Sequence, residues 1–413
     1  MRIGVDAREL CGRPTGVGRY LAGLLRQWSI DDRARRHEFV LYAPEAVPLN
    51  LDARRFATRL VAGSPGTWWE QVRMPAVAAG DHLDVWFAPG YTAPLRLRVP
   101  TVVAIHDLSF AAHPEWFGVR EGMRRRWLTR QSASRASAIV TISEFSKREL
   151  MERLDVAEER IFVVRPGIGS RACATSSVPG PRVLFVGSVF NRRHVPDLIR
   201  AFAPVARAHS DASLDIVGDN RTYPPQDLRV TIAAEGLLAQ VRWHEYVSDD
   251  RLRELYAHAR AFAFLSEYEG LGLTPLEALA AGVPPLLLDT AVARESCGDA
   301  ALYVPLGDLP RTTRALELLL FDDDVTRARI LGAAPRVLER FNWSRAAKKT
   351  LSVIENASTS RMMSRIAAAS DAPAARASAN ARARAPGGGA PGRGKECGPA
   401  HKVKNALHHH RVV

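Results

Sequence analysis

Short apolar runs alternate with helical patterns along most of the chain, and this alternation is the feature that most restricts its possible folds. Strands that alternate with helices form parallel sheets with helices on both faces. The sequence therefore predicts an α/β protein in which this pattern occurs twice, as two doubly wound parallel sheets. The expected strands are Arg2–Asp6, His37–Ala43, Arg59–Ala62, Val85–Ala88, Thr101–Ile105, Ala138–Ile142 and Ile161–Val164, and then Arg182–Val186, Leu214–Val217, Val241–Val247 and Ala261–Leu265.

A chain of 413 residues is long enough for two full cores. We expect an N-terminal domain at 1–170, a Ser- and Pro-rich linker at 171–181, and a second domain at 182–341. From Ser358 onward Ala, Arg, Gly and Pro dominate, so residues 357–413 are expected to be a disordered tail. This tail carries +8 of the net charge of +13. The basicity therefore gives no reason to expect a specific nucleic acid partner.

No apolar run approaches the roughly 20 residues needed to cross a bilayer. The four cysteines show no pairing or metal-like spacing, which is typical of a reducing compartment. We therefore expect a cytoplasmic protein. The basic helix expected at Arg120–Arg135 leaves two interpretations open. One is a solvated face, and the other is attraction to the anionic inner face of a membrane or to a pyrophosphate-linked acceptor.

The stretch Ser266–Leu279 carries the densest set of chemically useful residues. An apolar run precedes it and a helix is expected at Pro275–Ala281, so the loop joins a strand end to a helix N-terminus. Backbone N–H groups at such an N-terminus favour an anion, and glycines let the backbone approach a ligand. Thr274 is expected at the N-cap, with Glu277 completing a capping box. That box alone would account for Glu277, and Glu269 alone would be a solvated loop charge.

A second phosphate-binding pattern follows the strand Arg182–Val186. A turn beginning at Gly187 carries two adjacent arginines, Arg192 and Arg193, before the next helix. Arginine keeps its charge and can bind two oxygens of a phosphate at once, so this turn is suited to a diphosphate. The alternative is a pair of exposed arginines.

As a whole, Ser266–Leu279 resembles the E-x7-E element of the retaining glycosyltransferases of family 4, with Glu269 and Glu277 as the two carboxylates. Leu271 and Thr274 stand where that family usually has Phe and Pro. The resemblance spans roughly residues 1 to 355. It implies the GT-B fold, with two Rossmann-like domains facing across a cleft and a helix at 342–356 that crosses back to the first domain. It also implies that the domain at 1–170 is the acceptor side and that the domain at 182–341 binds the nucleotide sugar.

The same resemblance assigns roles to residues. It implies that Glu269 holds hydroxyls of the donor sugar, that Glu277 binds the ribose, and that His106, in the context Ile105-His-Asp-Leu108, lies against the donor sugar. The candidate catalytic residues are therefore His106 and Glu269. The candidate donor-binding residues are Gly16, Gly187, Arg192, Arg193, Val247, Gly270, Leu271, Gly272, Leu273 and Glu277.

Trp68–Pro75 and Ala88–Pro94 are similar to the branch of the family that transfers mannose or rhamnose into polysaccharides. GDP-mannose is therefore the first donor expected, with other GDP- and UDP-sugars left open, and the acceptor is expected to be a glycan or a lipid-linked sugar. The resemblance also implies metal-independent transfer with retention, by attack on the face that the leaving group occupies. Gly169 replaces an aspartate that is usual in the family.

Several alternatives accompany these expectations. His106, at a strand end, could be a satisfied buried histidine. The Asp322–Asp324 run is expected to be the acidic start of a helix rather than a metal-binding D-x-D. Neither half has a full dinucleotide fingerprint, which argues against a nicotinamide oxidoreductase. A catalytically silent sugar-nucleotide-binding or scaffold protein of the same fold is the alternative function.

Overall fold

The computed structural model describes residues 1–12, 15–169, 180–322 and 324–359. Residues 1–361 form one compact unit. Most of the expected linker at 171–181 and almost all of the expected tail at 357–413 lie outside the described residues.

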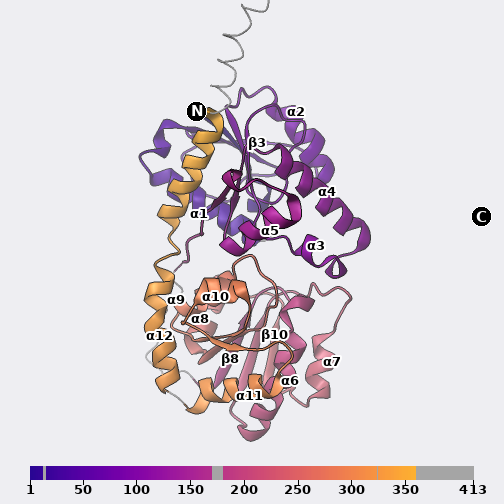
Figure 1. The fold of residues 1–413 in the computed structure, drawn as a ribbon, viewed down its shortest axis with the longest axis vertical. Coiled ribbons are helices and arrows are strands. Elements are labelled where there is room, and N and C mark those ends of the chain that lie inside the picture. The colour runs from indigo at the N-terminus through magenta and orange to yellow at the C-terminus, as the bar shows by residue number, and fades with distance from the viewer. Residues whose placement is uncertain (13–14, 170–179, 323, 360–413) are drawn as a thin grey trace, which may run out of the picture. The chain divides into compact units, whose positions relative to one another are not determined.

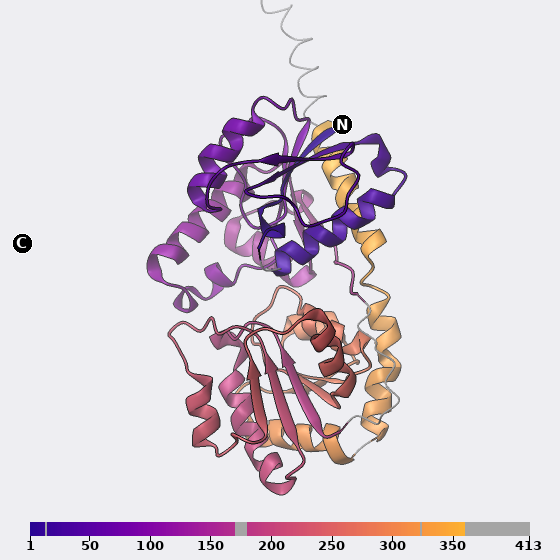
Figure 2. The same ribbon diagram turned by 180° about the vertical axis from the view of Figure 1, so that it is seen from behind.

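The first half of the chain forms a seven-stranded sheet in which every neighbouring pair is parallel. Its order is β3-β2-β1-β4-β5-β6-β7. Figures 1 and 2 show the ribbon from opposite sides. The strands are β1 (Arg2–Asp6), β2 (Glu38–Ala43), β3 (Phe56–Leu60), β4 (Val85–Ala88), β5 (Thr101–Ala104), β6 (Ala138–Thr141) and β7 (Ile161–Val163). The helices are α1 (Gly16–Ile30), α2 (Met74–Ala78), α3 (Ser109–Ala112), α4 (Val119–Arg135) and α5 (Glu144–Leu154).

The second half forms a six-stranded parallel sheet with the order β10-β9-β8-β11-β12-β13. Its strands are β8 (Arg182–Val186), β9 (Ser213–Val217), β10 (Val241–His244), β11 (Ala261–Phe264), β12 (Pro285–Leu288) and β13 (Leu302–Val304). Its helices are α6 (Val195–Ala208), α7 (Leu228–Ala234), α8 (Asp249–His258), α9 (Leu273–Ala280), α10 (Ala291–Cys297), α11 (Leu309–Glu317) and α12 (Asp324–Leu338). The predicted class, α/β with two doubly wound parallel sheets, is confirmed.

In each sheet the direction of winding reverses once. The reversal lies between β1 and β4 in the first sheet and between β8 and β11 in the second. In open α/β sheets, ligands bind outside the carboxyl ends of the strands at such a point. The loops that follow β1, β4, β8 and β11 are therefore the places where this fold offers a site.

A last helix, at 343–359, joins the core of the first sheet, whereas α12 packs against α9 and α10 of the second half (Figure 1). Its apolar residues share a core with α1, and the Trp28 indole Nε1 donates to the carbonyl of Ala347 at 3.0 Å. The Trp343 ring fills the space left by two glycines. A Cβ would lie 2.5 Å from that ring at Gly23 and 2.2 Å from it at Gly167.

Most strands agree with the sequence prediction to within one residue at each end, and two strands differ by more. The edge strand β3 begins at Phe56, three residues before the predicted Arg59. The prediction missed this start because residues 57–59 are exposed and do not form an apolar run. The predicted strand Val241–Val247 ends at His244 as β10, and Ser248 then caps α8 by accepting from the N–H of Arg251.

Candidate functional site

The segment Ser266–Gly272, which joins β11 to α9, is called the donor loop below. Its carboxylate, Glu269, is held on the side of the second sheet. Glu269 Oε1 accepts from Arg193 Nε at 2.8 Å and from Ser266 Oγ at 3.0 Å. The Glu269 and Arg193 side chains are only 15% and 13% exposed, so this is a mostly desolvated ion pair. Two residues 76 positions apart in the sequence thus meet at the β8–β11 reversal.

Gly187 makes room for the arginine. Its φ of +145° is unfavourable for a side chain, and a Cβ there would lie 2.6 Å from Arg193 Nη1. That Nη1 donates to the carbonyl of Ser188 at 2.8 Å, and the Phe264 ring lies 4.9 Å from the guanidinium carbon. The guanidinium is therefore oriented by fixed partners, and its Nη2 group can donate to a phosphate.

The helix after the donor loop begins earlier than predicted. Gly272, with φ +80°, is the N-cap of α9, and Leu273 is its first residue. Thr274 therefore has helical backbone and cannot act as the N-cap, and the N-cap makes no side-chain hydrogen bond. The predicted capping box of Thr274 with Glu277 is wrong, because the left-handed glycine starts the helix two residues sooner. Glu277 remains inside α9, so a capping role no longer accounts for it.

His106 follows β5 and is buried. Its Nε2 lies 2.7 Å from the carbonyl oxygen of Pro89, which can only accept, so Nε2 carries the proton. The rings of Tyr20 and Tyr91 lie edge-on at 4.8 and 5.7 Å. Burial lowers the pKa of His106, opposed by the hydrogen bond to Pro89. The imidazole is therefore neutral near pH 7, with Nδ1 as the nitrogen that can accept a hydrogen bond.

The donor loop also contacts the first half of the chain, through Gly270. Its carbonyl accepts from the hydroxyls of Ser143 and Ser146 at the start of α5. Ser146 Oγ donates as well to the carbonyl of His106 at 2.9 Å. A Cβ on Gly270 would lie 2.1 Å from that same carbonyl, so only glycine allows the two backbones to come this close. The predicted site residues His106 and Gly270 are thus in direct contact.

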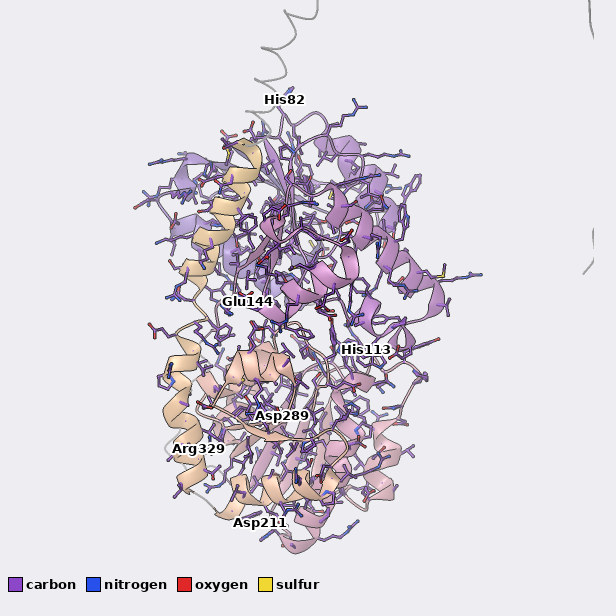
Figure 3. The ribbon with its side chains drawn as sticks, viewed as in Figure 1. His82, His113, Glu144, Asp211, Asp289 and Arg329 are labelled. Atoms are coloured by element: carbon purple, nitrogen blue, oxygen red, sulfur yellow. The ribbon has the colours of Figure 1, made fainter. Side chains whose placement is uncertain are left out.

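Tyr268 adds two hydrogen bonds to the contact between the donor loop and the first half of the chain. It is not among the site residues predicted from the sequence. Its hydroxyl donates to Glu149 Oε2 at 3.1 Å and accepts from the N–H of Leu108 at 3.3 Å. The rings of His113 and Trp116 pack edge-on against it (Figure 3 labels His113). Burial, and then the charges of Asp107 and Glu149, raise the pKa of Tyr268, so it stays a donor. A large aromatic residue within an otherwise small, polar loop was the available signal.

The two adjacent arginines have different neighbours. The Arg192 guanidinium lies over the Phe190 ring at 4.3 Å and 6.0 Å from the Trp116 ring. Burial raises the pKa of Asp107, but the charge of Arg192 and the hydrogen bond from Tyr91 outweigh it, and the net shift is downward. Arg192 therefore lies against residues of the first half, whereas Arg193 pairs with the donor loop.

The remaining candidates are spread out. A small pocket is lined by donor-loop residues, including Glu269 and Gly272, and by residues of β12 and α10. Leu271 is buried in the core, so only its backbone could meet a ligand, and Leu273 is half-buried. Three further candidates lie outside the donor loop. Gly16 is the first residue of α1 and has open space beside it. Val247 follows β10, and Glu277 lies within α9.

Glu70 joins the two stretches that suggested a mannosyl or rhamnosyl branch. Its Oε1 accepts from Arg8 Nη2 at 2.7 Å and from Thr92 Oγ1 at 2.5 Å. Arg8 also pairs with Asp6, at the end of β1, at 3.1 Å. These contacts tie the loops that follow β1 and β4, at the winding reversal of the first sheet. The resemblance to the mannosyl or rhamnosyl branch includes both stretches, but their contact is seen only in the fold.

The fold is an α/β protein with two parallel sheets. Its candidate site has a glycine-rich loop and a mostly desolvated Arg–Glu pair at the winding reversal of the second sheet. The chain matches two family models, described as glycosyl transferases group 1 over residues 175–333 and as glycosyltransferase family 4 over residues 14–170. Together they span most of the chain, which therefore belongs to glycosyltransferase family 4 and has the GT-B fold. It is a glycosyltransferase.

Among known proteins, the chain is similar to two mannosyltransferases. It is 24% identical to the O-antigen chain mannosyltransferase B of Escherichia coli, over 78% of this chain and 84% of that one. It is also 24% identical to the MMP alpha-(1->4)-mannosyltransferase of Mycolicibacterium hassiacum, over 86% of this chain and 91% of that one.

Solved structures share the fold. The crystal structure of Anabaena HepE in complex with UDP and glucose has a TM-score of 0.68 at 18% identity, covering 86% of this chain and 99% of that one. WaaG, a glycosyltransferase involved in lipopolysaccharide biosynthesis, has a TM-score of 0.66 at 16% identity, with 86% and 99% covered.

Proposed function

We propose that this glycosyltransferase moves a hexose, mannose first, from a nucleoside-diphosphate sugar to a hydroxyl of a glycan or lipid-linked acceptor. GDP-mannose is the first donor. The mannosyltransferase names of both relatives support the sugar, and the UDP bound to HepE supports a nucleoside-diphosphate donor. The observation that carries the proposal is the mostly desolvated Arg193–Glu269 pair beside Gly187, with His106 close to the same loop through Gly270.

The proposed chemistry is transfer with retention. The bond between the anomeric carbon and the β-phosphate oxygen breaks, and the acceptor oxygen forms the new bond on the same face. The acceptor proton passes to the departing phosphate. Arg193 and the Gly270–Leu273 amides stabilise the diphosphate charge, a type of contact worth about 10²–10³ in rate. Glu269 and His106 Nδ1 accept from hydroxyls of the donor sugar, and Glu277 accepts from the ribose.

Three measurements test this proposal. Thermal shifts with GDP-mannose, other GDP-sugars and UDP-sugars should rank GDP-mannose first. Proton NMR of the product should show the anomeric configuration of the donor, and an inverted linkage would contradict the mechanism. Activity should survive EDTA, since in this mechanism Arg193 and the Gly270–Leu273 amides supply the charge stabilisation that a metal ion would otherwise supply. Nucleotide-sugar binding without turnover on any acceptor would favour a silent binding protein.

We propose in addition a peripheral contact of α4 with an anionic membrane. Among the described residues, no helix is long and apolar enough to span a bilayer. Val119, Met123 and Trp127, spaced four residues apart on α4, are 73%, 58% and 58% exposed. Arginines at 120, 124, 126 and 130 lie on the same helix. An exposed apolar stripe beside cationic side chains is typical of a helix that lies in a lipid headgroup region.

Vesicle sedimentation tests the membrane contact. The protein should sediment with vesicles that contain phosphatidylglycerol but not with vesicles of phosphatidylcholine alone. The double change Met123→Ser with Trp127→Ser should reduce binding to the anionic vesicles about tenfold or more. Val230→Ser on α7, at a residue that is 66% exposed, is the matched control and should bind normally. Equal binding by both variants would contradict the contact.

A further inference from the structure

The short helix α10 reaches from the second sheet to the first half of the chain through one carboxylate. Glu295 Oε1 accepts from the backbone N–H of Glu144, and Oε2 accepts from that of Phe145, both at 2.8 Å. Arg165, in the segment after β7, donates from Nη2 to the same carboxylate at 3.2 Å. Figure 3 labels Glu144, and Figure 1 shows α5 and α10 next to each other.

These two N–H groups are the ones that a helix start cannot satisfy by itself. The first N–H groups of a helix have no partner within it, and the N-cap side chain usually satisfies one. Here Ser143 Oγ accepts from the N–H of Ser146 at 3.0 Å. The N–H groups of Glu144 and Phe145 are left for another acceptor, and Glu295 supplies both bonds. The first turn of α5 is thus completed by a residue from the other half of the chain.

Charge and burial make this contact stronger than an ordinary surface bond. A carboxylate at a helix N-terminus is favoured by the helix dipole, and hydrogen bonds to an ionised group are about twice as strong as neutral ones. The Glu295 side chain is only 15% exposed, so water screens the contact weakly. The backbone of α10 is itself anchored, because Arg340 Nη1 donates to the Glu295 carbonyl at 3.1 Å.

Other residues of α10 belong to the candidate donor pocket. Val292, Ala293 and Ser296 line that pocket together with Glu269 and donor-loop glycine. α10 has seven residues, so the pocket wall and the carboxylate that holds α5 are only one turn apart. α5 in turn presents Ser143 and Ser146 to the Gly270 carbonyl.

We propose that Glu295 is a positioning residue that ties the wall of the donor pocket to α5. Through α5 it fixes Ser143 and Ser146, and through Ser146 the backbone of His106, against the donor loop. An ordered donor pocket thereby sets the position of the first half of the chain, the expected acceptor side. The catalytic consequence rests on the proposed function, but the contact itself does not.

Hydrogen exchange of the full-length protein tests the contact independently of activity. In Glu295→Ala, the amides of Glu144 and Phe145 should exchange about 10- to 100-fold faster than in the unchanged protein. Glu295→Gln, which keeps one acceptor oxygen, should fall between. Asp289→Asn is the matched control, since Asp289 makes an exposed ion pair with Arg294 beside the same helix. Unchanged exchange at both amides in Glu295→Ala, with β5 and β8 still protected, would overturn the proposal.

Steady-state kinetics test the consequence. For Glu295→Ala, kcat/KM for the acceptor should fall at least about tenfold, while the affinity for the nucleoside diphosphate stays within about twofold. Glu295→Gln should recover part of the loss, and Asp289→Asn should match the unchanged protein. A normal acceptor kcat/KM despite faster exchange would overturn the positioning role. If the unchanged protein transfers no sugar from any donor, the proposed function fails, whereas the exchange result still decides the contact.

Discussion

Arg192 and Arg193 are neighbours in the chain, yet their guanidinium groups stabilise different charges. Arg193 pairs with Glu269 inside the second half, and Arg192 lies near Asp107 and Trp116 of the first half. The short 3-10 turn at Asn191–Arg193 points consecutive side chains in different directions. At the residue scale, the site is therefore a set of specific pairs, and Glu269 is the carboxylate paired with Arg193, the side chain that we propose binds the diphosphate.

Glu269→Gln should keep the fold and lower turnover by about two to three orders of magnitude. The amide keeps the shape of the side chain but removes the charge that we propose orients the sugar in the transition state. Binding of free nucleoside diphosphate should survive. Glu254→Gln, in an exposed ion pair with Arg251 on α8, is the control and should turn over normally. Steady-state kinetics with nucleotide titration measure both, and full turnover by Glu269→Gln would remove that residue from the mechanism.

His106 should make the folded state sensitive to acid. Burial lowers its pKa below the ordinary 6.5, so the unfolded chain binds the proton more readily. The contribution of His106 to stability is complete above pH 6.5 and is lost as the pH falls toward the folded-state pKa, by at most about 1.4 kcal/mol per pH unit. Denaturant unfolding at several pH values measures it. His106→Gln should show a shallower loss in acid, and identical pH profiles would contradict a buried neutral imidazole.

At the element scale, the starts of the helices separate structural from functional residues. α5 and α8 begin with serines that accept from N–H groups of the first turn, whereas α9 begins with a left-handed glycine and no side-chain cap. The sequence of α9 reads as a capping box, but the backbone at Gly272 decides otherwise. A capping role with Thr274 therefore does not account for Glu277, and its contact with the ribose stays a proposal.

Thr274→Ala should change the free energy of unfolding by less than about 0.5 kcal/mol, because Thr274 caps nothing. Ser248→Ala should cost about 0.5–2 kcal/mol, because Ser248 Oγ accepts from the N–H of Arg251 at 3.2 Å. Denaturant unfolding of both variants measures the difference. If Thr274→Ala were the more destabilising change, the helix start assigned to Gly272 would be wrong.

At the scale of the whole molecule, the helix at 343–359 completes the first domain from the far end of the sequence. Ala346, Leu351 and Ile354 are buried in the same core as α1 and β1. Glu355 accepts from His37 Nε2 at 2.9 Å and pairs with Arg33. Both cores are thus complete within residues 1–361, the compact unit.

A shortened protein ending at Arg361 should therefore keep its turnover on a soluble acceptor analogue and melt at the same temperature within about 2 °C. Loss of turnover in a protein that still unfolds cooperatively would contradict this expectation. Loss only on membrane-borne acceptor would instead assign the basic tail to docking. A second shortened protein ending at Asn342 is the control, and it should lose stability because the helix that completes the first core is gone.

Local patterns were enough to predict the class of fold and most of its strands. Apolar runs such as Val85–Ala88 and Arg182–Val186 are buried in the interior of a sheet, so composition alone marks them, and both match the observed bounds. The edge strand β3 was misplaced because its exposed face has no such mark. Likewise, the sequence predicted Glu269, Arg193 and Gly270 as site residues. It did not predict the hydrogen bond between Arg193 and Glu269.

What the sequence determined by itself was therefore whatever depends on neighbours along the chain, such as the alternation of strands and helices and the glycine-rich loop. Only the tertiary structure decided the pairs made by residues far apart in sequence, such as Tyr268 with Glu149 and Glu295 with the start of α5. Hydrogen bonds and ion pairs act over a few ångströms in space and leave no periodicity in the chain. They become visible only when folding has brought the two halves together.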